Sequence, residues 1–303
     1  VKLQTYTADR LTLDYDGPDF CIKGGLWDGR KLYDLYREAA LPLDWHEALF
    51  AKGRELGITV FSSPFDDYAV DLLEELDAPA YKIASPEITD ISLIEKIASM
   101  NKPILLSTGV ATIKDIDLAL KTIKKKHNKY AILKCVSAYP TPINELNLRG
   151  INLLKKKYKC AVGFSDHTIG DLASKVAVSL GATIIEKHFK VDGDEKSIDQ
   201  HFSMNLSKLK KFKKELNNVQ DCLGKENLDI LKSAKKSMSA RRSLYVCKDI
   251  KKGEKFTSEN IKSVRPSFGL HPKFLKKITG EKSNRDLKSG DRLTMSLIKN
   301  NLV

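Results

Sequence analysis

The chain has 303 residues and 42% hydrophobic content, enough for one large core or for two domains. Its longest uncharged apolar runs are only as long as a strand, and no N-terminal signal pattern is present, so we expect no membrane partner. The net charge of +13 comes from lysine runs without interleaved aromatic residues. Such runs are typical of solvated helix faces, so we expect no nucleic-acid partner.

The five cysteines are odd in number, scattered along the chain and without the spacing of metal ligands. This pattern indicates reduced thiols and predicts a cytoplasmic location.

Strand-like runs and amphipathic helical patterns alternate along the first two thirds of the chain. The strand-like runs start at residues 1, 58, 80, 103, 130, 160 and 182. The helical patterns cover 30–39, 44–57, 67–76, 92–100, 112–126, 148–158 and 172–180. Asp44 to Glu47 resembles a capping box, and Thr112 is expected to cap the helix that follows it. This rhythm predicts a parallel α/β fold.

Seven strands are one short of a closed (β/α)8 TIM barrel. We expect the first strand and helix of that barrel to precede Val1 in the intact protein. Serines stand at five of the seven strand ends. In a barrel all these ends build one active face, whereas an open doubly wound sheet places its site at a single crevice. The serines therefore favour the barrel.

Residues 160–190 read as strand, helix and strand. Because side chains alternate along a strand, Ser165 shares a face with His167, and Glu186 shares a face with His188. The carboxyl ends of parallel strands meet at one edge, so these four side chains should converge. A lone histidine is more often structural, but two at equivalent strand ends predict a shared metal or catalytic role. The intervening helix carries an apolar stripe made of Leu172, Val176 and Leu180.

Lys82 is harder to place from its strand. If residues 80–87 form one regular strand, Lys82 has the opposite parity to Ser85 and Glu87. Either the strand is irregular or Lys82 does not share their face. A surface lysine is the alternative, although the apolar neighbours of Lys82 favour a functional side chain.

The pattern changes after His188. Residues 206–223 form a long lysine-rich helical pattern, 224–239 a linker with some helical character, and 240–303 a small, mostly β domain. We therefore divide the chain into domains at 1–223 and 240–303, joined by the linker.

Several motifs resemble the sialic acid (nonulosonic acid) synthase family. They are YKIASPE (81–87), LSTG (106–109), GFSDHT (163–168) and EKHF (186–189). The segments RRSLYVCKDIKKGE (241–254) and RPSFGLHP (265–272) resemble that family's antifreeze-like SAF domain. Residues 24–36 and 265–274 are most similar to the branch of the family that makes pseudaminic acid.

The resemblance implies a condensation of phosphoenolpyruvate with a six-carbon amino sugar aldehyde, giving a nine-carbon acid and phosphate. His167 and His188 match ligands of a divalent cation, Mn²⁺ or Mg²⁺, which would polarise the aldehyde; imidazoles alone would also accept Zn²⁺, Co²⁺ or Fe²⁺. The positions that match the surroundings of phosphoenolpyruvate are Lys2, Ser63, Lys82, Ser85, Ser107, Ser137 and Ser165. Those that match the surroundings of the sugar are Gln4, Tyr139, Glu186 and Asp199.

The predicted catalytic residues are Lys82, Glu186 and Glu87, with Glu186 handling a proton. Arg265 matches an arginine that reaches the partner's active site in a domain-swapped homodimer. Three alternatives stay open at this point. They are an N-acetylneuraminate or legionaminate synthase, an aldol synthase that makes a shorter ulosonic acid from phosphoenolpyruvate, and a non-catalytic carbohydrate-binding protein.

Overall fold

The structure, a computed structural model, describes residues 1–298, so the last five residues of the expected C-terminal domain lie outside it. The chain divides into two compact units, Val1–Gly224 and Lys225–Val303. Each unit has its own cluster of buried apolar side chains.

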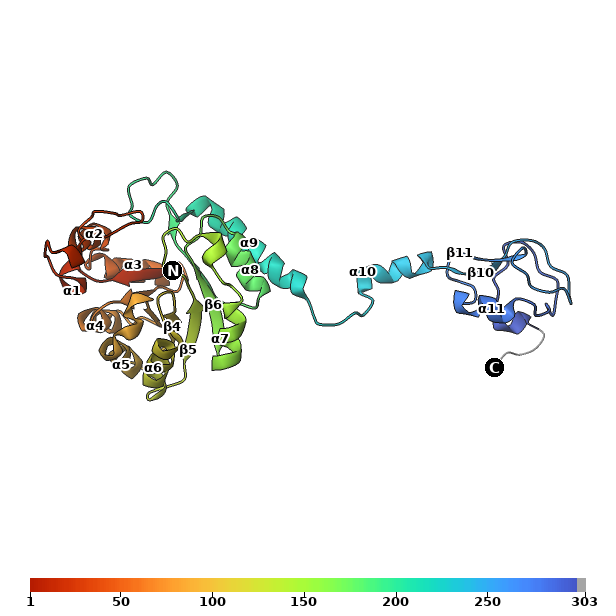
Figure 1. Cartoon of the computed structure of the whole chain (residues 1–303), viewed down its shortest axis with the longest axis horizontal. Helices are drawn as coiled ribbons and strands as arrows, with labels where there is room; N and C mark the ends of the chain where they lie inside the picture. Colours follow the sequence, from red (N-terminus) through yellow and green to blue (C-terminus); the bar gives the residue numbers. More distant parts are fainter. Residues whose placement is uncertain (299–303) are drawn as a thin grey trace. The chain divides into compact units, whose positions relative to one another are not determined.

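Seven parallel strands form the sheet of the N-terminal unit, and each strand pairs with the next one along the chain. Figure 1 shows the helices on the outer side of this curled sheet. The uninterrupted order is that of a (β/α)8 barrel, whereas a doubly wound sheet reverses its order at a switch point. The predicted barrel fold with seven strands is therefore confirmed. The strands are β1 (Lys2–Thr5), β2 (Phe61–Pro64), β3 (Tyr81–Ile83), β4 (Ile104–Ser107), β5 (Tyr130–Lys134), β6 (Ala161–Asp166) and β7 (Ile185–Lys187).

Helices connect these strands, and short 3-10 turns and a small strand pair complete the unit. The helices are α1 (Ala8–Leu11), α2 (Leu32–Ala39), α3 (Trp45–Glu55), α4 (Asp67–Glu75), α5 (Ile91–Ser99), α6 (Ile113–Lys124), α7 (Gly150–Tyr158), α8 (Leu172–Ser179) and α9 (Leu206–Leu223). The turns are η1 (Pro18–Phe20), η2 (Pro86–Thr89) and η3 (Ile143–Glu145). The small pair consists of β8 (Phe189–Lys190) and β9 (Met204–Asn205).

Two expected helix starts had different outcomes. Thr112 caps α6 in a full capping box with Asp115, as predicted. The capping box at Asp44 is wrong, because Asp44 already has helical backbone angles and its side chain makes no capping hydrogen bond. Gly57 follows the end of α3 with a positive φ of 65°, which suits a residue without a Cβ atom.

The core lies between the sheet and its helices, where residues such as Tyr81, Phe164 and Ile132 are fully buried. Helix α8 leaves two of its large residues exposed and buries a third, Val178. Leu172 is 57% exposed and Val176 39% exposed, whereas Ala173 and Ala177 are buried. Of the expected apolar stripe, Leu172 and Val176 therefore lie on the outer side of α8, whereas Leu180 packs against the core. Small side chains on the inner side let the helix pack closely against the sheet.

The C-terminal unit begins with short helical pieces in the expected linker, α10 (Lys232–Lys235) and η4 (Lys236–Ala240). An antiparallel pair follows, β10 (Ser243–Val246) with β11 (Ile261–Val264). The remaining elements are η5 (Pro272–Phe274), α11 (Leu275–Ile278) and η6 (Met295–Leu297). Isolated β-bridges such as Ile250 with Leu287 extend the pairing, and Leu244, Phe256 and Ile278 lie in its core.

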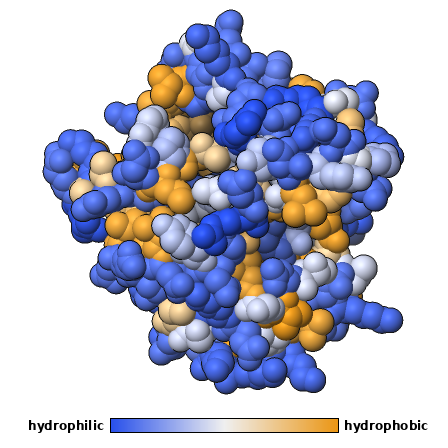
Figure 2. Space-filling view, turned by 90° about the vertical axis from the view of Figure 1, so that its left-hand side faces the viewer, coloured by the Kyte–Doolittle hydropathy of each residue, from blue (hydrophilic) through white to orange (hydrophobic). Residues whose placement is uncertain are grey.

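The face of the molecule in Figure 2 is mostly hydrophilic, with small apolar patches scattered over it. Across residues 1–298, no helix combines the length and apolar character that crossing a bilayer requires.

Candidate active site

A cluster of charges around Glu186 is the centre of the candidate site. Its Oε1 accepts a hydrogen bond from the hydroxyl of Ser165 at 2.7 Å and lies 3.4 Å from Lys82 Nζ. Its Oε2 lies 3.6 Å from Lys2 Nζ. Burial raises the pKa of Glu186, but Lys82, Lys2 and the Ser165 hydroxyl outweigh it and hold that pKa at about 2. Glu186 is therefore ionised at neutral pH.

Four strands supply this cluster. Ser165 in β6 stands directly opposite Glu186 in β7, which accounts for their hydrogen bond. Lys82 in β3 is only 2% exposed, and burial lowers its pKa although Glu186 opposes the shift. The structure thus brings Lys82 into the site and excludes the surface-lysine alternative.

The expected strand over residues 80–87 is wrong beyond Ile83. β3 ends there, Ser85 has helical backbone angles, and Pro86 opens the 3-10 turn η2. Strand alternation consequently does not relate Lys82 to Ser85 or Glu87.

The two strand-end histidines lie side by side, with ring centroids 5.4 Å apart. His167 Nδ1 is 3.0 Å from the backbone oxygen of Val136, an acceptor that fixes the proton on Nδ1 and leaves the lone pair on Nε2. Burial lowers the pKa of His167 to about 4, despite the opposing effect of that hydrogen bond. His188 Nδ1 lies 3.1 Å from Asp199 Oδ2. Both rings thus have an acceptor at Nδ1.

Aromatic side chains line the two imidazoles. The ring of Tyr139 lies 4.5 Å from that of His167, and Phe202 lies 5.1 Å from the ring of His188 and 5.3 Å from Tyr139. The ring of Trp27 lies 5.8 Å from that of Tyr139. Tyr139 was predicted as a site residue, whereas Trp27 and Phe202 were not. They come from long connections, and no strand or helix period marks their direction.

Three predicted serines carry hydroxyl groups that are buried without a partner. Within residues 1–298, no group hydrogen-bonds the Oγ atoms of Ser63, Ser107 and Ser137. Native proteins rarely leave such groups unpaired, so these hydroxyls are available to an ordered water or to a polar ligand. Gly109 permits the close approach, because a Cβ atom there would lie 2.3 Å from Ser137 Oγ.

Ser85 and Gln4 have different environments. The Ser85 hydroxyl accepts a hydrogen bond of 2.9 Å from the backbone N–H of Val110, so it supports a loop at the strand ends. Gln4 in β1 stands opposite Ser63 in β2 and therefore shares the face of that serine.

Glu87 lies in η2, close enough to Lys82 for the two charges to interact. Burial raises the pKa of Glu87 to about 7, and its own backbone N–H and Lys82 offset only part of that rise. Its Oε2 atom is buried and has no hydrogen-bond partner among the residues that the structure describes. A carboxyl group in this state can give or take a proton near neutral pH.

Arg265 belongs to the C-terminal unit, where it directly follows β11. Its predicted role in a partner's active site stays a prediction.

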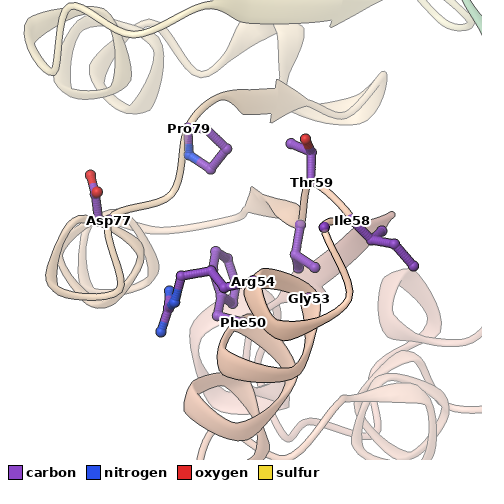
Figure 3. A pocket seen from close by; sticks show the side chains of 9 residues that line it. Phe50, Gly53, Arg54, Ile58, Thr59, Asp77 and Pro79 are labelled. Carbon is purple, nitrogen blue, oxygen red and sulfur yellow. The ribbon is translucent and has the colours of Figure 1, made fainter.

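A separate pocket of about 290 Å³ lies at the amino ends of β2 and β3, away from these strand ends. Figure 3 shows Phe50, Arg54, Ile58, Thr59 and Pro79 around it. None of the predicted site residues lines it.

The chain belongs to the NeuB family, whose model matches residues 1–228, and it also carries a SAF domain at residues 241–299. The family resemblance expected from the motifs is thus confirmed.

Curated relatives extend over nearly the whole chain. A pseudaminic acid synthase of Campylobacter jejuni is 47% identical over 297 residues, which is 98% of this chain and 87% of the relative. One of Helicobacter pylori is 44% identical and covers 100% of this chain and 89% of the relative. An N,N'-diacetyllegionaminic acid synthase of C. jejuni is 37% identical, over 83% of this chain and 78% of the relative.

Solved structures agree with the fold. A sialic acid synthetase of Leptospira borgpetersenii, in complex with citrate, matches with a TM-score of 0.68 and 30% identity, over 78% of each chain. The spore coat polysaccharide biosynthesis protein spsE of Bacillus subtilis matches with a TM-score of 0.61 and 29% identity, over 99% of this chain and 86% of that one.

Proposed function

We propose that this chain condenses phosphoenolpyruvate with 2,4-diacetamido-2,4,6-trideoxy-altrose to give pseudaminic acid and phosphate. The identity of 47% with a pseudaminic acid synthase over 98% of the chain supports this choice among the branches of the family. The single structural observation that supports phosphoenolpyruvate as substrate is the cluster of Lys2, Lys82, Ser165 and Glu186. Two lysines at one carboxylate suit a substrate with two anionic groups, a phosphate and a carboxylate.

The chain's own residues match the needs of the reaction. Lys2 and Lys82 attract the phosphate and carboxylate of phosphoenolpyruvate, and the unpartnered serine hydroxyls donate hydrogen bonds to them. C3 of phosphoenolpyruvate then bonds to the aldehyde carbon, whose oxygen takes up a proton and becomes a hydroxyl. Water adds at C2, and the bond between C2 and the phosphate oxygen breaks, so that phosphate leaves with that oxygen and the oxygen from water becomes the C2 ketone. Ionised Glu186 accepts a proton from the water or from the sugar. Glu87 exchanges a proton near pH 7.

We propose that His167 and His188 hold a divalent cation, Mn²⁺ or Mg²⁺. The donor set fits, because both rings have an acceptor at Nδ1 and His167 is neutral, which leaves Nε2 as a ligand atom. Within the described part of the chain, no group of three or more His, Cys, Asp and Glu side chains forms a ligand set. Two imidazoles therefore suit a cation that takes its remaining ligands from water and substrate. When bound, such a cation supplies Lewis-acid polarisation of the aldehyde.

We also propose that the enzyme is cytoplasmic and acts as a domain-swapped homodimer, in which Arg265 completes the sugar site of the partner. The family likeness of residues 265–274 supports this arrangement. A planar guanidinium can donate a fork of hydrogen bonds to an acyl oxygen or a carboxylate. Gln4, Tyr139 and Asp199 then complete the protomer's own sugar site.

Phosphate release tests the proposal. The protein is mixed with phosphoenolpyruvate, the diacetamido sugar and Mn²⁺, and phosphate is followed over time, with one component omitted in each control. We expect release that requires all three. Tight sugar binding without phosphate release would instead support the carbohydrate-binding alternative.

A further inference from the structure

A buried ion pair lies behind the candidate site. Lys187 Nζ is 3.0 Å from Asp166 Oδ2, and the two side chains are 3% and 0% exposed. Asp166 in β6 stands directly opposite Lys187 in β7, one residue beyond the pair of Ser165 and Glu186. Because side chains alternate, the ion pair lies on the face of the sheet that the candidate site does not use.

The Asp166 carboxylate, which directly precedes His167, binds groups in the chain that follows it. Its Oδ1 accepts hydrogen bonds from the backbone N–H of Thr168 at 2.8 Å and from the Thr168 hydroxyl at 2.7 Å. Its Oδ2 accepts a third from the Ser174 hydroxyl in α8 at 2.6 Å. His167 is thereby held in a turn anchored to both the sheet and a helix.

Lys187 ties this turn to the neighbouring strand. Besides its contact with Asp166, its Nζ donates a hydrogen bond of 2.7 Å to the backbone oxygen of Thr168. Lys187 directly precedes His188. One ammonium group thus links the chain immediately before His188 to the chain immediately after His167.

We propose that Asp166 and Lys187 are a positioning pair that sets the spacing and orientation of the two imidazoles. Both side chains lie on the face of the sheet opposite to that of Ser165 and Glu186. The pair locks the register of β6 against β7 at the last residues before the histidines. A shift of the register by one residue would turn the side chains of the shifted strand to the other face of the sheet. Buried ion pairs add little net stability to a fold. A role in selecting one strand register therefore accounts better for this pair. The catalytic consequence rests on the proposed function, but the positioning does not.

The test uses Lys187→Met, which keeps the side-chain length without the charge, and Asp166→Asn. A matched control is Leu154→Ala, which weakens the core under α7 without touching the pair. Mn²⁺ binding to each protein without substrates is measured by electron paramagnetic resonance. Imidazole ¹⁵N spectra of the metal-free proteins report the tautomer and order of His167 and His188.

We expect Mn²⁺ affinity to fall by about 10–100-fold in both variants, as is usual when residues that orient metal ligands are changed. The imidazole signals of the variants should show mixed tautomers or broadening, whereas Leu154→Ala should keep wild-type spectra and affinity. Wild-type spectra and affinity in a folded Lys187→Met protein would overturn the proposal. If Lys187→Met does not fold, Ser174→Ala decides, since it removes one bond to Asp166 and should give a smaller change of the same kind.

Measurements on the wild-type protein distinguish a failure of the proposed metal site from a failure of the proposed positioning pair. If it binds no Mn²⁺, the proposed metal site fails. The imidazole spectra, which need no metal, then still decide whether Asp166 and Lys187 position the rings.

Discussion

Lys2 Nζ lies 3.6 Å from Glu186 Oε2, although the two residues belong to β1 and β7, the first and last strands of the seven-stranded sheet. The sheet therefore curls until its outermost strands share one set of charges. Glu186 thus contacts a residue that lies far from it in the sequence. Its removal should affect the rate of the reaction more than the binding of substrate.

Glu186→Gln tests this expectation. The variant removes a negative charge from between two lysines, so the KM for phosphoenolpyruvate should stay the same or fall. The kcat should fall by at least about 100-fold, because the proton acceptor is lost. Steady-state kinetics measure both. Glu74→Gln, at an ion pair with Lys102 outside the site, is the control and should keep both constants. An unchanged kcat in Glu186→Gln would contradict the assigned role.

The unpartnered serines lead to a second prediction. Ser107→Ala and Ser137→Ala should not lower the stability of the free protein, because each removes a buried hydroxyl that has no partner in residues 1–298. The KM for phosphoenolpyruvate should rise by roughly 10-fold, corresponding to about 1.5 kcal/mol for a hydrogen bond to a charged group. Thermal unfolding and kinetics are compared in the same preparations. Ser174→Ala should instead lower the stability, because the Ser174 hydroxyl donates a hydrogen bond to Asp166.

The buried imidazole predicts a dependence of stability on pH. The pKa of His167 is about 4 in the folded protein and near 6.5 in the unfolded chain, so between these values only the unfolded chain binds a proton. His167 therefore adds stability as the pH rises from 4 to 6.5, by up to about 3 kcal/mol. The difference in unfolding free energy between wild type and His167→Gln should grow over this range. A constant difference would show that the imidazole is not held neutral.

Glu87 should act in the opposite direction over a similar range. Its pKa is about 7 in the folded protein and near 4.5 when unfolded, so its contribution is fully present below pH 4.5 and is lost as the pH rises through 7. Because Glu87 retains some exposure, we expect a loss of about 1–3 kcal/mol relative to Glu87→Gln. Urea unfolding at a series of pH values measures it. If the wild type gains stability over Glu87→Gln as the pH rises, the carboxyl is not buried as described.

The swapped arrangement has a complementation test. Arg265→Ala and His188→Ala proteins are each expected to have little activity, and they are mixed under conditions that allow subunit exchange. If Arg265 acts in the partner's site, a mixed dimer carries both defects in one site and leaves the other intact. About half of the wild-type activity per mixed dimer should then return. Without swapping, each site keeps one defect and mixing restores nothing.

The alternation of strands and helices, and the polar residues at the strand ends, could be predicted because they depend on local periodicity. The convergence of Ser165, Glu186, His167 and His188 follows from the same rule, since neighbouring parallel strands end at the same edge. The face on which Lys82 lies was ambiguous because the rule assumes a continuous strand. The strand ends before Pro86, which opens a 3-10 turn.

The residues that sequence analysis missed depend on the paths of connections or on pairing across strands. Trp27 and Phe202 reach the imidazoles from long irregular segments, whose course no periodic pattern determines. Asp166 and Lys187 were visible as neighbours of the histidines. Their contact depends on the register of β6 and β7, which the sequence of either strand alone does not specify.

Mass spectrometry of the product in a competition between two sugars shows which acceptor the enzyme prefers. The protein is given phosphoenolpyruvate, Mn²⁺ and equal amounts of 2,4-diacetamido-2,4,6-trideoxy-altrose and N-acetylmannosamine. We predict that the nine-carbon acid derived from the diacetamido sugar forms in large excess, with one phosphate released per molecule. Preferential formation of N-acetylneuraminic acid, or no condensation product from either sugar, would contradict the account.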